Sequence, residues 1–391
     1  MPEPIGVLEL RSVRGTGGGP EKTILLGAAR SDPARVRVTV AYLRDDRDPV
    51  FGIDTWAAKL GIDYAEIRER HSFDPGIWKP LTALVRERGI QIVHAHDYKT
   101  NLLALMLARR TGVVPLATEH GWTGHSWRER AVYYRADKWL ARFFPRIVAV
   151  SENIREELVR HGVAPDRVTT VLNGIDPAAF CRDRHREREV RASLEIADSD
   201  IVIGSAGRLE PQKRFDLLVE AVSGLTHALP RLRLFIAGEG SERPRLEALQ
   251  RRPGIGNRVT LLGHRTDIAR LHHAFDLYVQ SSDYEGTPNS VLEAMAMETP
   301  IVATDAGGTR QLVTDAVHAL VVRTGSSVAL TDAIRAALSA PGASAVRARA
   351  ARLRVEGPLS FAARTERLEG LYRSLLNDSR VSIAPTLNVP A

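Results

Sequence analysis

Short apolar runs alternate with amphipathic stretches along this chain of 391 residues. The runs are continuous rather than alternating, which is typical of strands buried on both faces of a parallel sheet. The stretches between them, such as 21–29 and 101–109, have helical spacing. Strands that alternate with helices predict βαβ units and an α/β fold. The predicted strands are 5–10, 35–43, 90–94, 113–118, 146–150, 201–206, 232–237, 259–262, 277–280 and 301–304.

The length predicts two domains, because one domain commonly takes about 150 residues. A charged stretch of low apolar content, 177–200, lies between two series of strands. We interpret it as the connection between domains 1–180 and 181–358, and the alternative is an exposed helix inside one domain. Residues 359–377 have the periodicity of a helix, and 378–391 are expected to form a flexible tail.

Composition narrows the class of protein further. Hydrophobic residues make up 44% and charged residues 26%, which excludes a largely disordered chain. The net charge of +7 permits an anionic partner without requiring one. The single cysteine, Cys181, excludes an intrachain disulfide and suits a reducing compartment. Because the chain also lacks a long apolar run and a basic N-terminal leader region, we expect a cytoplasmic protein.

The densest chemistry lies in the segment 281–313. A predicted strand is followed by a loop that carries Glu285, and then by a helix that begins near Ser290. The N-terminus of a helix has free N–H groups and a partial positive charge, so it suits a phosphate. Glu293 lies about one turn into this helix, so both carboxylates can face one site. Ser290 and Glu293 also have the spacing of a capping box, which is the structural alternative for Glu293.

Two cations mark a second candidate site. Arg208 and Lys213 lie on the turn between the strand 201–206 and the next helix. Two cations at the carboxyl end of a parallel strand are suited to clamp a diphosphate, whereas the alternative is a solvated basic loop. Gly238 and Gly240 end the following strand, but an isolated Gly-x-Gly is weak evidence of a ligand.

The N-terminal half carries glycines and histidines at predicted strand ends. Gly17–Gly19 precedes a helix, His94, His96 and Asp97 follow one strand, and His120 follows the next. The spacing of His94 and His96 is compatible with a metal, but no third ligand accompanies them in the sequence. Alternation places both rings on one face of the strand, so packing in the core is the alternative.

Several motifs occur in one order along the chain: VSENIREELV, VLNGID, GRLEPQKRFDLLVEA, GEG and YEGTPNSVLEAMA. Together they resemble the nucleotide-sugar glycosyltransferases with the GT-B fold, family four in particular. The resemblance implies two doubly wound Rossmann-like domains that face a central cleft. It also implies that the helix 359–377 crosses back to the N-terminal domain.

The resemblance assigns roles to individual residues. Arg208 and Lys213 would bind the donor diphosphate and support catalysis, Glu293 would bind the ribose, and Glu285 would lie near the transferred sugar. His120 would also lie beside that sugar as a catalytic residue. Further donor-binding residues would be Gly18, Gly19, Gly238, Thr287, Pro288, Asn289 and Ser290. His96 and Asp97 would contact the acceptor.

The implied reaction is transfer of a sugar from a nucleotide diphosphate to a glycan or lipid-linked acceptor, with retention of configuration, in cell-envelope or exopolysaccharide synthesis. No side-chain nucleophile is required in such enzymes. No Asp-x-Asp motif accompanies the site, so we expect neither metal nor cofactor. Thr287 and Gln311 depart from the family pattern, which leaves the choice of donor sugar open. The alternatives are a nucleotide-sugar epimerase on the same fold, a dinucleotide-dependent oxidoreductase and a basic nucleic-acid-binding protein.

The segment Gly124–Arg146 combines six aromatic side chains with a local charge of +4, from six cations and two anions. Basic aromatic helices can lie on anionic membranes. We therefore expect peripheral contact with the inner face of the cell membrane, and the alternative is an ordinary domain helix whose aromatics pack inward.

Overall fold

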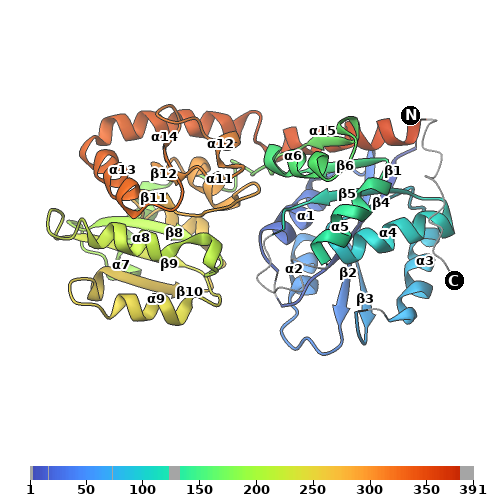
Figure 1. Ribbon diagram of the computed structural model, residues 1–391, viewed down its shortest axis with the longest axis horizontal. Coiled ribbons are helices and arrows are strands. Elements are labelled where there is room, and N and C mark those ends of the chain that lie inside the picture. Colours follow the sequence, from blue (N-terminus) through green and yellow to red (C-terminus); the bar gives the residue numbers. More distant parts are fainter. Residues whose placement is uncertain (1–2, 16, 73, 123–132, 379–391) are drawn as a thin grey trace. The chain divides into compact units, whose positions relative to one another are not determined.

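The computed structural model describes residues 3–15, 17–72, 74–122 and 133–378. The chain divides into two compact units, and each is built around one parallel sheet with helices on its faces (Figure 1). The N-terminal unit comprises residues 1–173 and 361–391, and the second unit comprises residues 174–360. Every helix within the described ranges is too short or too polar to cross a bilayer.

The N-terminal unit contains a seven-stranded sheet with the order β3-β2-β1-β4-β5-β6-β7. Its strands are β1 (Ile5–Ser12), β2 (Val36–Asp45), β3 (Asp63–Glu69), β4 (Ile92–Ala95), β5 (Val114–Glu119), β6 (Arg146–Ala149) and β7 (Val168–Thr170). Its helices are α1 (Gly19–Arg30), α2 (Ile53–Leu60), α3 (Trp78–Glu87), α4 (Tyr98–Thr111), α5 (Tyr134–Leu140), α6 (Glu152–Arg160) and α15 (Phe361–Asn377).

Alternate residues of the central strand β1 enter different cores. Leu8 and Leu10 pack with side chains of α3, α4 and α6 on one face of the sheet. Val7 packs on the other face, where Leu368 and Leu375 of α15 complete the core. Because both faces are covered, the strand reads as an apolar run in the sequence. The same alternation turns Glu9, two residues after Val7, toward the face that α15 covers.

The second unit contains a six-stranded sheet with the order β10-β9-β8-β11-β12-β13. Its strands are β8 (Ile201–Ala206), β9 (Leu232–Ala237), β10 (Val259–Gly263), β11 (Leu277–Gln280), β12 (Ile301–Thr304) and β13 (Leu320–Val322). Its helices are α7 (Arg184–Ser193), α8 (Phe215–Ser223), α9 (Arg243–Gln250), α10 (Ile268–His272), α11 (Asn289–Ala296), α12 (Thr309–Leu312), α13 (Ser327–Ser339) and α14 (Pro341–Glu356).

The charged stretch 177–200 does not connect the two units, and that interpretation was wrong. The chain passes between the units at residues 173–174 and again at 360–361. The middle of the stretch forms α7, which packs against α10 inside the second unit. Arg191 of α7 is only 6% exposed, and its guanidinium donates to the backbone oxygens of Ala197, Asp200 and Ala274. Main-chain acceptors therefore anchor this arginine in a helix that is otherwise mostly exposed, and the alternative of an exposed helix inside one domain is correct.

The C-terminal helix belongs to the N-terminal unit. After residue 360 the chain forms α15, which packs against α1 and the sheet core. Arg35 bonds to Glu369 of this helix at 3.0 Å. The predicted tail 378–391 lies outside the described residues from 379 onward.

Candidate functional site

Each sheet has a point at which the order of its strands reverses. In the second unit, β9 and β10 follow β8 on one side, whereas β11 lies on the other side of β8. In the N-terminal unit the reversal falls between β1 and β4. Ligands of open α/β sheets bind outside the carboxyl ends of the strands at such points. The segments that follow β8 and β11, and those that follow β1 and β4, are therefore the expected ligand-binding segments.

The two predicted cations follow β8 directly. Arg208 is exposed, and its side chain forms neither an ion pair nor a hydrogen bond with any residue of the described ranges. Lys213 ends the short 3-10 helix Pro211–Lys213, and its Nζ lies 2.6 Å from Oε1 of Glu285. An ammonium group has three donors, so this ion pair leaves Lys213 able to bind a second anion.

Glu285 is held by groups from both loops. Its Oε1 accepts from Lys213 Nζ and, at 2.6 Å, from Ser282 Oγ. Two further bonds tie the loop after β11 to the 3-10 helix after β8. The backbone N–H of Asp283 donates to the backbone carbonyl oxygen of Gln212, and Ser281 Oγ donates to that of Lys213, both at 2.8 Å. The fold thus brings Lys213 and Glu285, predicted separately, into one site at the reversal point.

Helix α11 begins where the sequence predicted, and Glu293 is not part of a capping box. The N-cap residue is Pro288, which offers no side-chain hydrogen bond to the first turn. Ser290 lies inside the helix and hydrogen-bonds to Tyr278, whose pKa burial raises. Glu293 is 6% exposed. The capping-box alternative for Glu293 is therefore wrong. Thr287, which directly precedes the N-cap residue, is also buried.

Two glycines are required by close backbone approaches around this site. A Cβ on Gly238 would lie 1.8 Å from the Gly207 oxygen, and the φ of Gly238 is +150°. A Cβ on Gly307 would lie 2.3 Å from the Glu285 oxygen, and its φ is +54°. Both glycines therefore let neighbouring loops pack against the turns that carry Arg208 and Glu285.

The glycine loop of the N-terminal unit is tied to its own helix. The N–H of Gly18 donates to Oε2 of Glu21 at 2.6 Å, and Glu21 also pairs with Arg11. Gly17 has a φ of +78°, and a Cβ there would collide with Glu21. Gly18 and Gly19 thus lie at the start of α1, at the reversal point, with a buried carboxylate beneath them.

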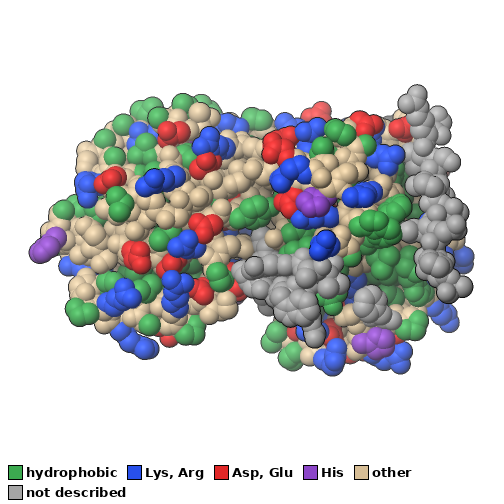
Figure 2. Space-filling model, viewed as in Figure 1, with side chains coloured by type: hydrophobic (Ala, Val, Ile, Leu, Met, Phe, Trp, Pro, Cys, Tyr) green, Lys and Arg blue, Asp and Glu red, His purple; other side chains and the backbone are tan. Residues whose placement is uncertain are grey.

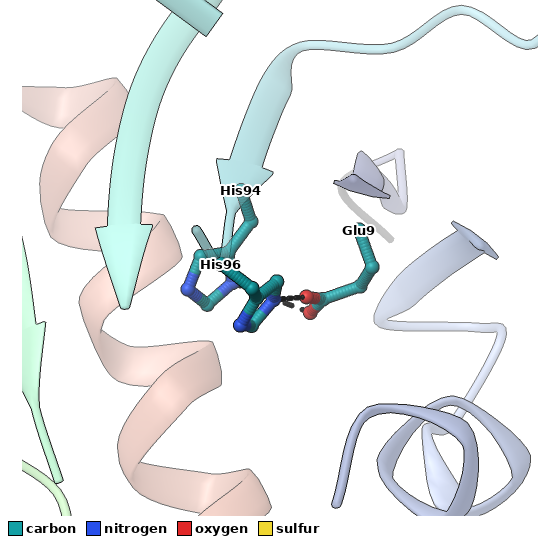
Figure 3. A group of neighbouring side chains, drawn as sticks. All are labelled: Glu9, His94 and His96. Atoms are coloured by element: carbon teal, nitrogen blue, oxygen red, sulfur yellow. Dashed lines mark hydrogen bonds and ion pairs between the residues drawn. The ribbon is translucent and has the colours of Figure 1, made fainter. Parts of the chain in front are cut away.

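His94 and His96 meet a carboxylate that sequence reasoning missed. The register of β1 and β4 places Glu9 opposite His94, and both imidazoles lie beside its carboxylate (Figure 3). Glu9 bonds to Nε2 of His96, and its Oε1 lies 3.2 Å from Nδ1 of His94. Tyr372 of α15 completes the group, bonding to His94 at 2.9 Å and to Glu9 at 3.1 Å. Glu9 is the charged residue within the apolar run 5–10, and this position was the signal in the sequence that could have identified it.

The expectation that His94 and His96 have no third partner is thus wrong, because adjacent parallel strands supply one. The nearest donor atoms of Glu9, His94 and His96 lie within 4.8 Å of one another, a separation that could accommodate a cation. Hydrogen bonds already account for all four ring nitrogens, since His94 Nε2 also bonds to Thr118 at 2.6 Å. The group is therefore complete as a hydrogen-bonded network.

His120 extends this network to the end of β5. Its Nε2 lies 3.2 Å from Nδ1 of His96, and its ring is half-buried. Burial lowers the pKa of His120 well below its usual value, and Arg11 lowers it further. Burial also lowers the pKa of His96 to about 4, although the Glu9 carboxylate opposes this. Both imidazoles are consequently neutral near pH 7.

Asp97 caps helix α4. Its Oδ1 accepts from the backbone N–H groups of Lys99 and Thr100 at 3.0 Å, and its Oδ2 accepts from Ser12 N at 2.7 Å. The side chains of His96 and Asp97 are therefore both engaged inside the N-terminal unit. Contact of either with an acceptor remains a prediction.

A second buried acidic group lies directly before His120. Asn101 donates to Glu119 at 2.9 Å and to Asp137 at 2.8 Å, and Asp137 also accepts from Trp122 at 2.9 Å. Burial and the neighbouring Asp137 raise the pKa of Glu119 well above its usual value. Through Asn101 the two carboxyl groups link α4 and α5 at the end of β5.

The aromatic segment Gly124–Arg146 is described only from residue 133 onward, and residues 123–132 lie outside the described ranges. Trp139 is 45% exposed and packs edge-on against Phe143, whereas Phe144 is fully buried. Tyr133 is 38% exposed and stacks on Tyr98. The expected aromatic surface is thus divided between core and solvent.

Two families of glycosyltransferases account for most of the chain. Residues 17–179 match Glycosyltransferase Family 4, and residues 186–354 match Glycosyl transferases group 1. EpsD of Bacillus subtilis is 29% identical over 273 residues, which are 66% of this chain and 71% of that protein. The UDP-Gal:alpha-D-GlcNAc-diphosphoundecaprenol alpha-1,3-galactosyltransferase of Escherichia coli is 28% identical over 242 residues, 60% of this chain and 62% of that enzyme.

The fold is also similar to that of solved glycosyltransferases. HepE of Anabaena, solved in complex with UDP-glucose, has a TM-score of 0.84 and 21% identity, covering 95% of this chain and 100% of that chain. The two matched families and the pair of Rossmann-like sheets define a GT-B glycosyltransferase. The chain belongs to the Glycosyltransferase Family 4 and group 1 glycosyltransferases of this type.

Proposed function

We propose that this glycosyltransferase moves a hexose or related sugar from a nucleotide diphosphate to a glycan or lipid-linked acceptor, with retention of configuration. The observation that carries the proposal is the site at the reversal point of the second sheet. There Arg208, Lys213, Glu285 and the N-terminus of α11 come from the segments after two adjacent strands. Cations and a helix N-terminus suit a diphosphate, and buried carboxylates suit sugar hydroxyls.

The chemistry follows from where charge develops. Breaking the bond between the sugar and the phosphate leaves negative charge on the diphosphate. Arg208 has no partner within the described ranges, and Lys213 retains free donors, so both can stabilise that charge. Glu293 would accept bonds from the ribose hydroxyls, and Glu285 would lie beside the sugar. In the N-terminal unit, Gly18 and Gly19 would approach the donor, and neutral His120 would face the transferred sugar.

The relatives suggest which donor and acceptor to test first. HepE was solved with UDP-glucose, and the name of the Escherichia coli relative specifies UDP-Gal and a diphosphoundecaprenol-linked acceptor. We therefore propose a UDP-sugar donor, a lipid-linked acceptor and a role in cell-envelope or exopolysaccharide synthesis. Figure 2 shows basic and acidic side chains interspersed on the described part of the face it presents, which favours a small anionic ligand over a polyanion.

The proposal is tested by thermal unfolding with UDP, other nucleoside diphosphates and their sugar derivatives. A ligand that binds only the native state at one hundred times its Kd adds about 2.7 kcal/mol to the free energy of unfolding. The stabilising donor is then incubated with lipid-linked acceptors, and the anomeric configuration of the product is determined by NMR. If no nucleotide or nucleotide sugar raises the melting temperature, the proposed function is wrong, and an inverted product would contradict retention.

Activity is expected to persist in excess chelator. Arg208, Lys213 and the α11 N-terminus would supply the positive charge that a divalent ion supplies in other glycosyltransferases. The measurement compares kcat with and without chelator, using protein dialysed against chelator beforehand. Loss of turnover that magnesium or manganese restores would show that an ion, rather than these cations, stabilises the leaving group.

We also propose that α5 and its neighbours contact the membrane that carries the acceptor. Trp139 and Tyr133 are exposed beside the exposed cations Arg135 and Arg142. Aromatic rings enter the interfacial region of a bilayer, while cations bind anionic headgroups at about 1 kcal/mol each. Lys138 is less suited to this role, because it bonds to Glu157 and lies over the Trp122 ring.

Substituting Arg135→Glu and Trp139→Ala together is expected to reduce binding to anionic liposomes at least about tenfold. Co-sedimentation at low and high salt measures this, with neutral liposomes as the reference. Arg251→Glu changes the charge equally at an exposed position of the second unit and is expected to have no effect. If the unmodified protein does not co-sediment with anionic liposomes at low salt, the membrane proposal is wrong and a soluble acceptor becomes the better hypothesis.

A further inference from the structure

Three side chains form a continuous line of hydrogen bonds in the N-terminal unit. It runs from the Glu9 carboxylate through the two ring nitrogens of His96 to Nε2 of His120. Glu9 and His96 are 8% and 3% exposed. Figure 3 shows the first link, in which the His96 ring from the end of β4 meets Glu9 of β1. Each internal link has one proton, so fixing one end of the line fixes every other position.

The Glu9 end of the line is an acceptor. Burial by itself raises the pKa of Glu9, but His94 and His96 outweigh this effect and hold the pKa well below its usual value. The ionised carboxylate accepts from the Tyr372 hydroxyl at 3.1 Å. It also receives the bond from His96, so the proton of that link must lie on Nε2 of His96.

The order of the remaining protons follows. A neutral imidazole has one donor and one acceptor nitrogen, so His96 presents the lone pair of Nδ1. His120 Nε2, at 3.2 Å, must then be the donor of the second link. The other nitrogen of neutral His120, Nδ1, is left with its lone pair. His120 therefore offers a hydrogen-bond acceptor beyond the network.

We infer that Glu9 and His96 are positioning residues that fix His120 as the Nε2–H tautomer, so that its Nδ1 selects a sugar hydroxyl as its hydrogen-bond partner. This inference rests on the proposed function for the identity of the ligand. A hydroxyl can donate a hydrogen bond to Nδ1. A carboxylate or a carbonyl oxygen at the same place has no proton to donate, so its lone pairs would be repelled by the lone pair of Nδ1. The line thus discriminates between sugars by the type of group they present, and it excludes a uronic acid whose carboxylate occupies that place.

The inference is tested first on the free protein. Histidine labelled with nitrogen-15 is incorporated, and two-bond proton–nitrogen correlation spectra distinguish the protonated from the bare nitrogen of each ring. The His120→Gln variant identifies the His120 signals among those of the 12 histidines. We expect Nε2 of His120 to carry the proton from about pH 6 to about pH 8. A proton on Nδ1, or on both nitrogens, would overturn the inference.

The Glu9→Gln variant then breaks the line. The Gln amide can either accept from Nε2 of His96 or donate to it. When it donates, each hydrogen bond of the line reverses its direction, and the proton of His120 lies on Nδ1. We expect a mixture of His120 tautomers and a fall in kcat/KM of about two- to tenfold, the size expected for one lost hydrogen bond between neutral groups. Tyr372→Phe is the matched control, because it removes another bond to the same carboxylate without touching the line. It is expected to keep the wild-type tautomer and activity.

The outcomes separate this inference from the proposed function. If no nucleotide sugar binds, the function is wrong, while the spectrum of the free protein still decides the tautomer. Equal loss of activity in Glu9→Gln and Tyr372→Phe, with His120 unchanged in both spectra, would reduce Glu9 to a structural role and overturn the inference. A stoichiometric divalent ion bound by His94 and His96 would also overturn it, because the ion would replace the protons of the line.

Discussion

Replacing Arg208 with Ala is expected to weaken UDP binding about 10- to 150-fold without lowering the melting temperature. One charge-assisted hydrogen bond contributes about 1.5–3 kcal/mol, which corresponds to this range of Kd. The side chain of Arg208 is exposed and has no partner among the described residues, so its removal leaves no buried group unsatisfied. Isothermal titration measures Kd, and thermal unfolding verifies the fold.

Lys213→Met is expected to weaken UDP binding by a similar factor, but at some loss of stability. The methionine retains the aliphatic stem, whereas the Glu285 carboxylate, 7% exposed, loses the nearby ammonium group. Comparing the two variants thus separates binding from folding.

Arg214→Gln is the matched control for both variants. Arg214 adjoins the same 3-10 helix, but its guanidinium is already paired with Asp216 and Asp283. Removing its charge changes the net charge equally without removing the proposed clamp, so Kd should change less than about twofold. If Arg208→Ala and Lys213→Met leave Kd at the wild-type value, or if Arg214→Gln weakens binding as much as they do, the diphosphate assignment is wrong.

Gly238→Ala is expected to destabilise the second unit by at least about 3 kcal/mol. The new Cβ would lie 1.8 Å from the carbonyl oxygen of Gly207, and neither group is the end of a flexible side chain. The φ of +150° adds strain for any residue with a side chain. For a domain of this size the melting temperature should fall by roughly 10 °C.

Gly342→Ala provides the control for this substitution. Gly342 lies in the first turn of α14, and a Cβ there would meet nothing within 4 Å. Alanine in a helix loses less backbone entropy than glycine, so this variant should be neutral or slightly more stable. If Gly238→Ala instead melts like the wild type and loses only nucleotide affinity, Gly238 contacts the donor directly and its structural role is secondary.

Most of the strands that were predicted correctly lie inside a sheet and are covered on both faces, because double burial leaves a continuous apolar run. Strand β3, Asp63–Glu69, was missed since it lies at the edge of its sheet and carries charged residues on its open positions. The charged stretch 177–200 was misassigned for a related reason. One of the three carbonyl groups that hold Arg191, that of Ala274, comes from a distant segment, and the sequence does not show that this segment lies beside the stretch.

The sequence by itself determined the α/β class and the local chemistry of each strand end: the cations after β8, the helix N-terminus after β11 and the histidines after β4 and β5. Each of these features depends on neighbours within a few residues, which the sequence displays directly. Only the tertiary structure decided which ends meet. Lys213 reaches Glu285 across 72 positions, and Glu9 reaches His96 across 87. Such pairs form because the order of the strands in each sheet places their ends side by side. Helices that pack across both faces of the sheet fix this order, and their packing depends on the whole domain rather than on any local pattern.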